Sequence, residues 1–282
     1  MRPESHISSA ATVAAVTEAS PSASVSGGVD EERARREQEA YDEHGVEEAM
    51  VAWHGRFPHV FQSPNTRRGE RRFDALTRAT VAGGRVLDMG CGDGESSARL
   101  LEMGAAYVLG IDISQAAIAR AQPRAVPGRL EFRLGDVTRE LEGERFQCIF
   151  GRSILHHIDY RGALPRLYDE HLAPGGAMLF MEPQGENLLI RLYTRLVAAA
   201  HTPDERSFMN DDLRWLRAHY PTIELYPVNY LTFPAAICTS MLRLAPDNAL
   251  LGACDRVDDR LAARAPRLRS HFRQTIVVIR KP

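Results

Sequence analysis

Val86-Leu87-Asp88-Met89-Gly90-Cys91-Gly92-Asp93-Gly94-Glu95 is the stretch of sequence that decides the fold. Its apolar first half predicts a short buried strand over residues 85–89, and residues 95 to about 103 predict a helix. Glycines at alternate positions join the two, and such a turn lets backbone approach a ligand closely because no Cβ intervenes. The unpaired N–H groups at the start of the helix face the same place. We therefore expect a small molecule to bind over this turn.

Beyond this turn, short β-prone segments alternate with helical ones. Further strands are predicted at residues 107–112, 130–134, 146–151, 177–182, 223–228 and 274–280. Helices are predicted between them at 114–121, with Ser114 as its N-cap, at 164–171 and at 211–219. The alternation implies right-handed βαβ crossovers and a mainly parallel sheet, whose ligands bind beyond the carboxyl ends of the strands. The predicted fold class is α/β, a doubly wound Rossmann-like sheet of seven strands.

The segments that flank this core differ from it in composition. The first residues are rich in Ala, Ser, Val and Thr and lack the charged start and continuous apolar segment of a signal peptide. A polar turn is predicted at 63–69, and an amphipathic helix at 187–200. The predicted division is a flexible, disordered tail (1–30), an N-terminal helical cap (31–80) and a core (81–282) with helical cap inserts at about 183–222 and 229–270.

Composition argues against several classes of function. The net charge is −2, so no basic excess indicates a nucleic-acid partner. No apolar run approaches the length of a membrane span, and no membrane partner is expected. The four cysteines lack metal-knuckle spacing and the histidines are scattered, which predicts free thiols in a reducing cytoplasm and no metal site. Lys281 is the only lysine, so a lysine nucleophile is nearly excluded.

Two classes of cofactor-binding protein with doubly wound sheets commonly have such a glycine turn. The dinucleotide fingerprint reads G-x-G-x-x-G, whereas this turn reads G-x-G-x-G and has Glu95 where the third glycine would stand. Asp88 inside the strand end also disfavours NAD. Both features resemble the first motif of class I S-adenosylmethionine-dependent methyltransferases. The resemblance covers about residues 83–182, including Leu155-His156-His157 and the turn Leu172-Ala173-Pro174-Gly175-Gly176, and it implies S-adenosylmethionine as the cofactor.

The resemblance also implies roles for individual residues. Asp112 follows Asp88 by 24 positions and would hold the ribose hydroxyls, while Asp136 would accept from the adenine amine. Asp88 would take the ammonium of the methionine part, directly or through water. Its alternative role is to organise the turn, and Asp136 has the alternative of an ordinary turn acid. The implied cofactor-binding residues are Asp88, Gly90, Cys91, Gly92, Asp112, Ile113, Asp136, Val137, Gly151 and Ser153.

Methyl transfer needs a dry site, an acceptor aligned with the S–CH3 bond and, for a hydroxyl acceptor, a base that removes its proton. His156 and His157 follow the fourth predicted strand and Glu182 ends the fifth, so these are the candidate catalytic residues. Histidine suits proton removal because it titrates near neutral pH. The alternatives are a structural role for one histidine, and an ion pair between Glu182 and an arginine of the cap.

The segments outside the core are expected to select the acceptor. Arg67 and Arg68 are candidates for neutralising the cofactor carboxylate or an acidic substrate. Candidates for an aromatic pocket are Tyr41, Trp53, His54, Phe57, His59, Tyr193, Phe208, Tyr230 and Phe233. The residues after Glu182 resemble bacterial small-molecule and natural-product methyltransferases, which implies O- or N-methylation of a small molecule in secondary metabolism. The alternatives are non-methyl chemistry such as cyclisation and a non-catalytic cofactor-binding subunit. The sequence leaves open whether the chain is a monomer or a homodimer.

Overall fold

The computed structural model describes residues 45–282 except 140, 142, 188–189 and 193–206, together with five residues between 32 and 39. The tail predicted for residues 1–30 therefore lies outside the described residues. So does most of the amphipathic helix predicted for 187–200, of which residues 190–192 are described and helical.

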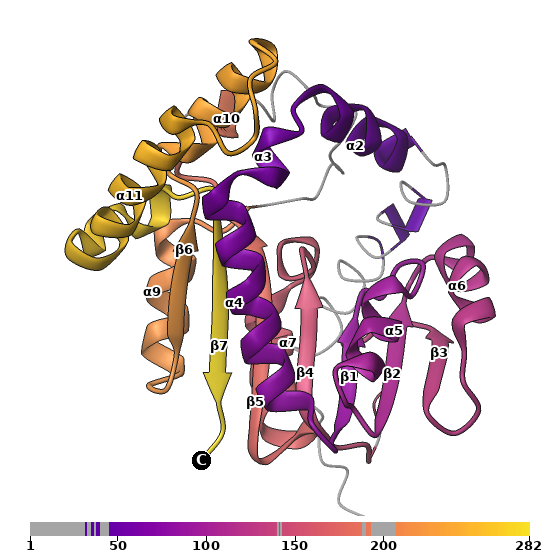
Figure 1. Ribbon diagram of the computed structural model, residues 1–282. Coiled ribbons are helices and arrows are strands. Elements are labelled where there is room, and N and C mark those ends of the chain that lie inside the picture. The colour runs from indigo at the N-terminus through magenta and orange to yellow at the C-terminus, as the bar shows by residue number, and fades with distance from the viewer. Residues whose placement is uncertain are drawn as a thin grey trace, which may run out of the picture.

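The sheet contains seven strands in the order β3-β2-β1-β4-β5-β7-β6 (Figure 1). All neighbours are parallel except β7, which is antiparallel to both β5 and β6. The chain leaves β1 in one direction to build β2 and β3 and then returns to place β4 on the other side of β1. Ligands of doubly wound sheets bind at such a reversal point. The strands are β1 (Arg85–Met89), β2 (Tyr107–Asp112), β3 (Leu130–Leu134), β4 (Phe146–Arg152), β5 (Leu172–Pro183), β6 (Glu224–Val228) and β7 (Gln274–Arg280). The predicted fold class is confirmed.

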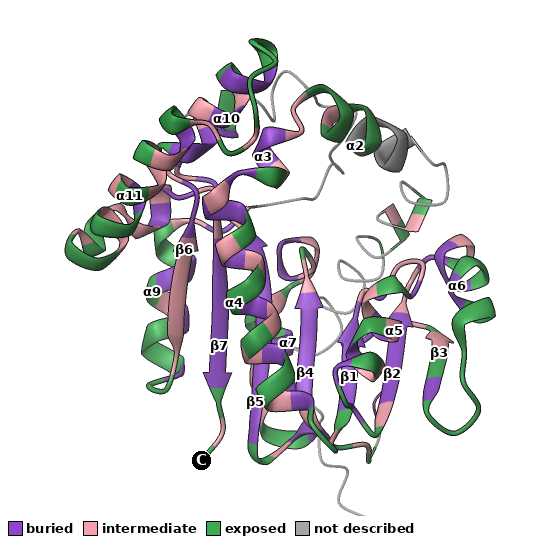
Figure 2. Ribbon diagram, in the orientation of Figure 1, coloured by how far each residue is buried: buried purple, intermediate pink, exposed green. Residues whose placement is uncertain are grey.

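Helices cover both faces of the sheet, so its central strands are buried on both sides (Figure 2). On one face lie α4 (Pro64–Val81) and α5 (Glu95–Glu102), which contribute Phe73, Val81 and Leu100 to the core. On the other face lie α7 (Tyr160–Arg166) and α9 (Asn210–His219), which contribute Leu164 and Leu213. The helix that ends at residue 81 is thus part of the core packing. The shorter elements are α6 (Gln115–Ala121), η1 (Gln122–Arg124), η2 (Leu155–His157), η3 (Leu167–His171) and η5 (Pro266–His271).

A second group of helices packs around a small apolar cluster of its own, made of Val60, Ile190, Phe233, Ala236 and Leu251. These helices are α3 (His59–Gln62), α10 (Thr232–Met241) and α11 (Ala249–Arg264), and α2 (Gly45–Arg56) adjoins them through the His54 ring, which packs edge-on against Phe61. Figure 1 shows α2, α3 and α10 beyond the carboxyl ends of the parallel strands. A helical cap built from segments far apart in the sequence therefore stands over the edge where ligands bind.

Three predicted boundaries were wrong. Residues 63–69 are not a turn but the cap and first turns of α4, because Ser63 Oγ accepts from the Thr66 N–H and Pro64 holds the first helical position. β5 begins at residue 172 rather than 177, since Phe146 pairs with Leu172 across a bulge. The helix predicted for 164–171 already begins at residue 160, and its last five residues form a π-helix.

Gly94 has a second reason to be glycine besides its left-handed φ of 81°. A Cβ at Gly94 would lie 2.6 Å from the Phe132 ring, whereas a Cβ at Gly92, with φ of 55°, would meet no atom within 4 Å. We predict that Gly92→Ala costs about 1–2 kcal/mol of unfolding free energy, the ordinary strain of a left-handed residue. Gly94→Ala should cost at least about 1 kcal/mol more, because its Cβ would also meet the partly buried Phe132 ring and, at 3.1 Å, the Ala121 Cβ. Urea denaturation of both variants checks this, and equal losses would contradict it.

Candidate functional site

Backbone hydrogen bonds from the N–H groups of the glycine turn to β2 hold the turn in place. The N–H groups of Gly90 and Cys91 both donate to the Ile111 carbonyl oxygen, at 2.9 and 3.1 Å. One residue later, the Gly92 N–H donates to Asp112 Oδ2 at 2.8 Å, and the Ser114 N–H donates to Oδ1 at 2.9 Å. Asp112 therefore lies directly beside the turn. Since each carboxylate oxygen carries two lone pairs, Asp112 keeps capacity for further donors.

Asp88 points into the protein. It is 1% exposed, and its Oδ2 accepts from Ser97 Oγ on α5 at 2.6 Å. Burial raises its pKa to about 7, against the smaller lowering effects of Ser97 and Arg152. The geometry matches the alternative role, in which Asp88 anchors α5 beneath the turn, and leaves it no exposed surface for direct contact with an ammonium group.

The buried Asp88 carboxyl predicts a pH dependence of stability. An acid whose folded-state pKa exceeds its unfolded value, near 3.9, takes up protons preferentially in the folded state. Its contribution to the unfolding free energy is therefore largest at low pH and is lost as the pH rises from about 4 to about 7. We expect the stability of the protein relative to Asp88→Asn to be greater at pH 4.5 than at pH 7.5 in chemical denaturation. An identical difference at both pH values would contradict this.

The residues predicted to surround an adenine ring lie after β2 and β3. Asp136 Oδ1 accepts from both the N–H and the hydroxyl of Thr138, at 2.8 and 2.7 Å, and Oδ2 faces Arg139 at 3.6 Å. Asp136 thus organises its own turn. Val137 is buried and Ile113 is partly exposed. Cys91 is also buried, which raises the pKa of its thiol and keeps it uncharged.

Ile154 forms a shared wall behind two of the predicted glycines. A Cβ at Gly90 would lie 2.6 Å from Ile154 Cδ1, and one at Gly151 would lie 2.5 Å from its Cγ2. Ser153 has a positive φ of 54° and donates its N–H to the Met181 carbonyl oxygen. These contacts bring the ends of β1, β4 and β5 together, while Gly92, which has no neighbour on its Cβ side, leaves open space above the turn.

Glu182 is the polar centre of this edge. It is fully buried, and its Oε1 accepts from the N–H groups of Ile154 and Leu155, both at 3.0 Å. Its Oε2 lies 2.7 Å from His156 Nδ1. An ionised Glu182 carboxylate can only accept this hydrogen bond, which assigns a proton to His156 Nδ1. The alternative, an ion pair with an arginine of the cap, is not seen among the described residues, because β5 directs Glu182 toward the loop after β4.

His156 and His157 differ in exposure. His156 is 5% exposed and held by Glu182, while His157 is partly exposed and packs against it with a ring-centroid separation of 4.1 Å. One histidine of the pair thus has the structural contact that the sequence reading anticipated. Within the described part of the chain, no cluster of His, Cys, Asp and Glu is arranged to hold a metal ion.

Several candidates for acceptor selection have other partners. Arg68 gives two hydrogen bonds of 2.7 Å to Asp255 and another to Asp259, so it ties α4 to α11 and is not available for a cofactor carboxylate. Phe208 and Phe233 are buried in apolar clusters. His59 is buried with its Nδ1 2.9 Å from Thr239 Oγ1. Tyr41 and Tyr193 lie outside the described residues.

Three residues of this edge were not predicted from the sequence as part of the site. Arg152 and Glu70 form an ion pair near the turn, and Ser97 holds Asp88. Ser97 and Arg152 lie inside the matched motifs, but neither residue type is distinctive there. Glu70 precedes the first strand, and no pattern in the sequence connects it with β4.

We found no helix in the described residues that could span a membrane.

Comparison with known proteins agrees with this geometry. Residues 86–176 match the family model described as "Methyltransferase domain". An uncharacterized methyltransferase of Mycobacterium tuberculosis is 38% identical over 127 residues, which is 43% of this chain and 64% of that protein. A trans-aconitate 2-methyltransferase of Deinococcus radiodurans is 39% identical over 100 residues, 35% of this chain and 37% of that protein. The chain thus spans less than two thirds of these relatives.

Two solved structures share the fold. Phosphoethanolamine N-methyltransferase 2 of Haemonchus contortus, in complex with S-adenosyl-L-methionine, has a TM-score of 0.52 and 18% identity, over 75% of this chain and 52% of that chain. The N-methyltransferase NodS of Bradyrhizobium japonicum, in complex with S-adenosyl-L-homocysteine, has a TM-score of 0.50 and 15% identity, over 78% and 89%. The match over residues 86–176 and the order of the sheet thus identify a methyltransferase domain in this chain.

Proposed function

We propose that the protein transfers a methyl group from S-adenosylmethionine to a small-molecule acceptor. The observation that carries the proposal is the contact between the Gly92 N–H and Asp112 at the carboxyl ends of β1 and β2. It sets a carboxylate beside an open glycine turn, which is the arrangement a ribose diol needs. Supporting it, the family match covers this turn.

The residues of the turn fit the cofactor. Above Gly92 there is space where a side chain would otherwise stand, so a ligand can approach the backbone. We assign Asp112 to the ribose hydroxyls, and Ile113 with Val137 to the faces of the adenine. Gly90, Cys91, Gly151 and Ser153 line the methionine part. When bound, the sulfonium supplies an electrophilic methyl carbon, and the chain has to align the acceptor and handle its proton.

We assign proton removal to the pair of histidines, with Glu182 as the residue that positions His156. Because Glu182 fixes the proton of His156 on Nδ1, Nε2 is the nitrogen able to accept a proton from a hydroxyl acceptor. His157 lies against His156 and is the more exposed of the two. An acceptor that is already a neutral amine would not require this base.

Single substitutions test the assignment of the base. His156→Ala or His157→Ala should lower turnover by about tenfold or more, the low end of a general-base contribution. Cofactor affinity should stay nearly unchanged, because neither imidazole is assigned to the cofactor. Steady-state kinetics and calorimetric titration separate the two effects. If both variants keep full turnover, the base lies elsewhere or is not needed.

The reaction itself is tested by product analysis with S-adenosylmethionine and a panel of small hydroxylated, carboxylated and amine acceptors. Methyl transfer requires S-adenosylhomocysteine to accumulate in step with a methylated product. Acceptor conversion without S-adenosylhomocysteine would indicate the alternative, cyclisation or other non-methyl chemistry. Cofactor binding without any turnover in the presence of a partner protein would favour the non-catalytic subunit.

We further propose that the acceptor belongs to bacterial secondary metabolism and that the reaction takes place in the cytoplasm. The first point rests on the resemblance of Glu182-Pro183-Gln184-Gly185-Glu186-Asn187 to bacterial natural-product methyltransferases. The second is supported by the four cysteines, all of which are free thiols, as a reducing compartment would leave them. The helical cap over the strand ends is the part that we expect to choose the acceptor.

A further inference from the structure

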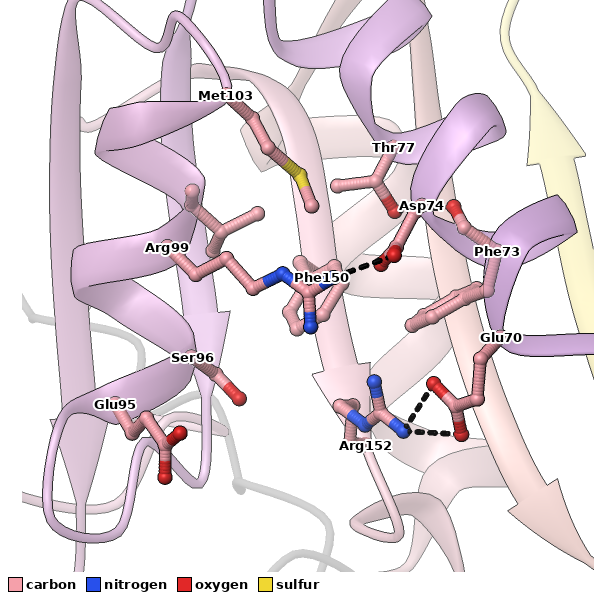
Figure 3. A pocket seen from close by; sticks show the side chains of 11 residues that line it. Glu70, Phe73, Asp74, Thr77, Glu95, Ser96, Arg99, Met103, Phe150 and Arg152 are labelled. Carbon is pink, nitrogen blue, oxygen red and sulfur yellow. Dashed lines mark hydrogen bonds and ion pairs between the residues drawn. The ribbon is translucent and has the colours of Figure 1, made fainter. Parts of the chain in front are cut away.

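A cavity of about 290 Å³ opens between α4, α5 and β4 (Figure 3). Its floor is apolar, with Phe73 and Phe150 packed at a ring-centroid separation of 5.2 Å. Its walls carry charges of both signs, and none of these groups has a role in the site described so far. The lining consists of Glu70, Phe73, Asp74, Thr77, Glu95, Ser96, Arg99, Leu100, Met103, Phe150 and Arg152.

One end of this cavity adjoins the glycine turn. Glu95 and Ser96 directly follow the turn, and Arg152 directly follows Gly151 at the end of β4. Figure 3 shows these residues together with Glu70 at one end of the cavity, and Met103 and Thr77 toward the other. The charge of Arg152 also acts on the buried Asp88 carboxyl, whose pKa it lowers in part. Arg152 is the last residue of β4, and Gly151 before it pairs with Met89 at the end of β1, so Arg152 lies at the carboxyl ends of both strands.

Arg152 forms an ion pair with Glu70, and a bound ligand can share or replace the hydrogen bonds of this pair. Its Nη2 donates to both Glu70 oxygens, at 2.8 and 2.9 Å, and its guanidinium lies 5.4 Å from the centre of the Phe73 ring. About a third of each charged side chain is exposed, 33% for Arg152 and 35% for Glu70. An ion pair with that exposure contributes little to stability. The remaining donors and acceptors of the pair can thus serve a ligand at little cost to the fold.

An adjacent cation and anion are the complement of a zwitterion. A free α-amino acid group presents a carboxylate and an ammonium on one carbon, and a guanidinium binds the carboxylate in a bidentate fashion. We propose that Glu70 and Arg152 bind the amino-acid end of S-adenosylmethionine, with Arg152 on its carboxylate and Glu70 on its ammonium. This rests on the proposed function, and it gives Glu70 the contact that the inward-facing Asp88 cannot make.

The test compares ligands that differ only in the amino-acid end. S-adenosylhomocysteine and 5′-methylthioadenosine share the nucleoside and a neutral sulfur, but the second lacks the amino acid. We expect Arg152→Gln and Glu70→Gln each to weaken binding of S-adenosylhomocysteine by about tenfold to a hundredfold, the range of a charge-assisted hydrogen bond. Binding of 5′-methylthioadenosine should change by less than about twofold in the same calorimetric titrations. Equal weakening of both ligands, or of neither, would overturn the proposal.

Decarboxylated S-adenosylmethionine separates the two residues. It keeps the ammonium and lacks the carboxylate, so Arg152→Gln should not weaken its binding further, while Glu70→Gln should. If Arg152→Gln weakens this ligand as much as S-adenosylmethionine, Arg152 does not contact the carboxylate.

A matched control lies in the same cavity. Arg99 and Asp74 form a second ion pair farther from the turn. Arg99→Gln should leave the affinity for S-adenosylhomocysteine within about twofold of the wild type, and a loss as large as that of Arg152→Gln would contradict the assignment. The double variant Glu70→Arg/Arg152→Glu keeps an ion pair between the two positions, so the fold retains it. The positive and negative charges are exchanged, however, so binding of S-adenosylhomocysteine should still be weakened. A wild type that binds neither S-adenosylhomocysteine nor 5′-methylthioadenosine would refute the proposed function instead.

Discussion

Glu182→Gln is expected to lower the turnover of the enzyme by about a hundredfold or more, within the range of general-base catalysis. The amide oxygen still accepts from the Ile154 and Leu155 N–H groups, so the loop after β4 keeps its place. The amide nitrogen, however, is a donor facing His156 Nδ1. The imidazole must then carry its proton on Nε2, and this nitrogen, which we assign to the acceptor, can no longer take up a proton.

Three measurements check this expectation. Steady-state kinetics should show the loss in kcat, while calorimetric titration should show an affinity for S-adenosylmethionine within about twofold of the wild type, because the substitution preserves the loop. The pH–rate profile of the wild type should show the ascending limb of an essential base, and the variant should lose it. An unchanged kcat would contradict the role of His156 as the base.

Asp212→Asn is the matched control for Glu182→Gln. Asp212 is also a buried carboxylate, but it binds Tyr160 and Arg161 on the face of the sheet covered by α7 and α9, with distances of 2.6 and 2.7 Å. Its replacement should lower the unfolding free energy and leave kcat nearly unchanged. A loss of kcat as large as that of Glu182→Gln would mean that loss of stability alone explains both results.

Asp112→Ala is expected to weaken binding of S-adenosylmethionine by about a hundredfold or more. The carboxylate is assigned two charge-assisted hydrogen bonds from the ribose, each contributing about 1.5–3 kcal/mol, and every 1.4 kcal/mol is a factor of about ten in affinity. The substitution also removes the acceptor of the Gly92 N–H, so the turn loses a support as well. Calorimetric titration measures the affinity directly.

Asp93→Ala serves as the control for Asp112→Ala. Asp93 lies in the same turn, but its carboxylate is 45% exposed and pairs with Arg124 at 3.4 Å. We expect the affinity of this variant to stay within about threefold of the wild type, the effect of a weak surface pair. If Asp112→Ala binds the cofactor as the wild type does, the ribose assignment is wrong and the cofactor lies elsewhere on the edge.

The sequence predicted the sheet well because each unit of it is local. A strand, a glycine turn and a helix follow one another within about twenty residues, and the handedness of the crossover is a general property of such units. Ser114 is an example of a correct local prediction, since it is the N-cap of α6, as its position directly before the helix indicates. The ends of strands were less well predicted where hydrogen bonding to another strand decides them. The start of β5 depends on Phe146, a residue of another strand.

The sequence by itself determined the glycine turn, the acid at the end of β2 and the order of the motifs, because residues close along the chain create them. The direction of Asp88, the pair of Glu182 with His156 and the pair of Glu70 with Arg152 were decided by the tertiary structure alone. Glu70 and Arg152 stand 82 positions apart and meet because α4, which precedes β1 in the chain, packs over β4. Which helix covers which strand is a property of the packed core, and no local pattern of residues encodes it.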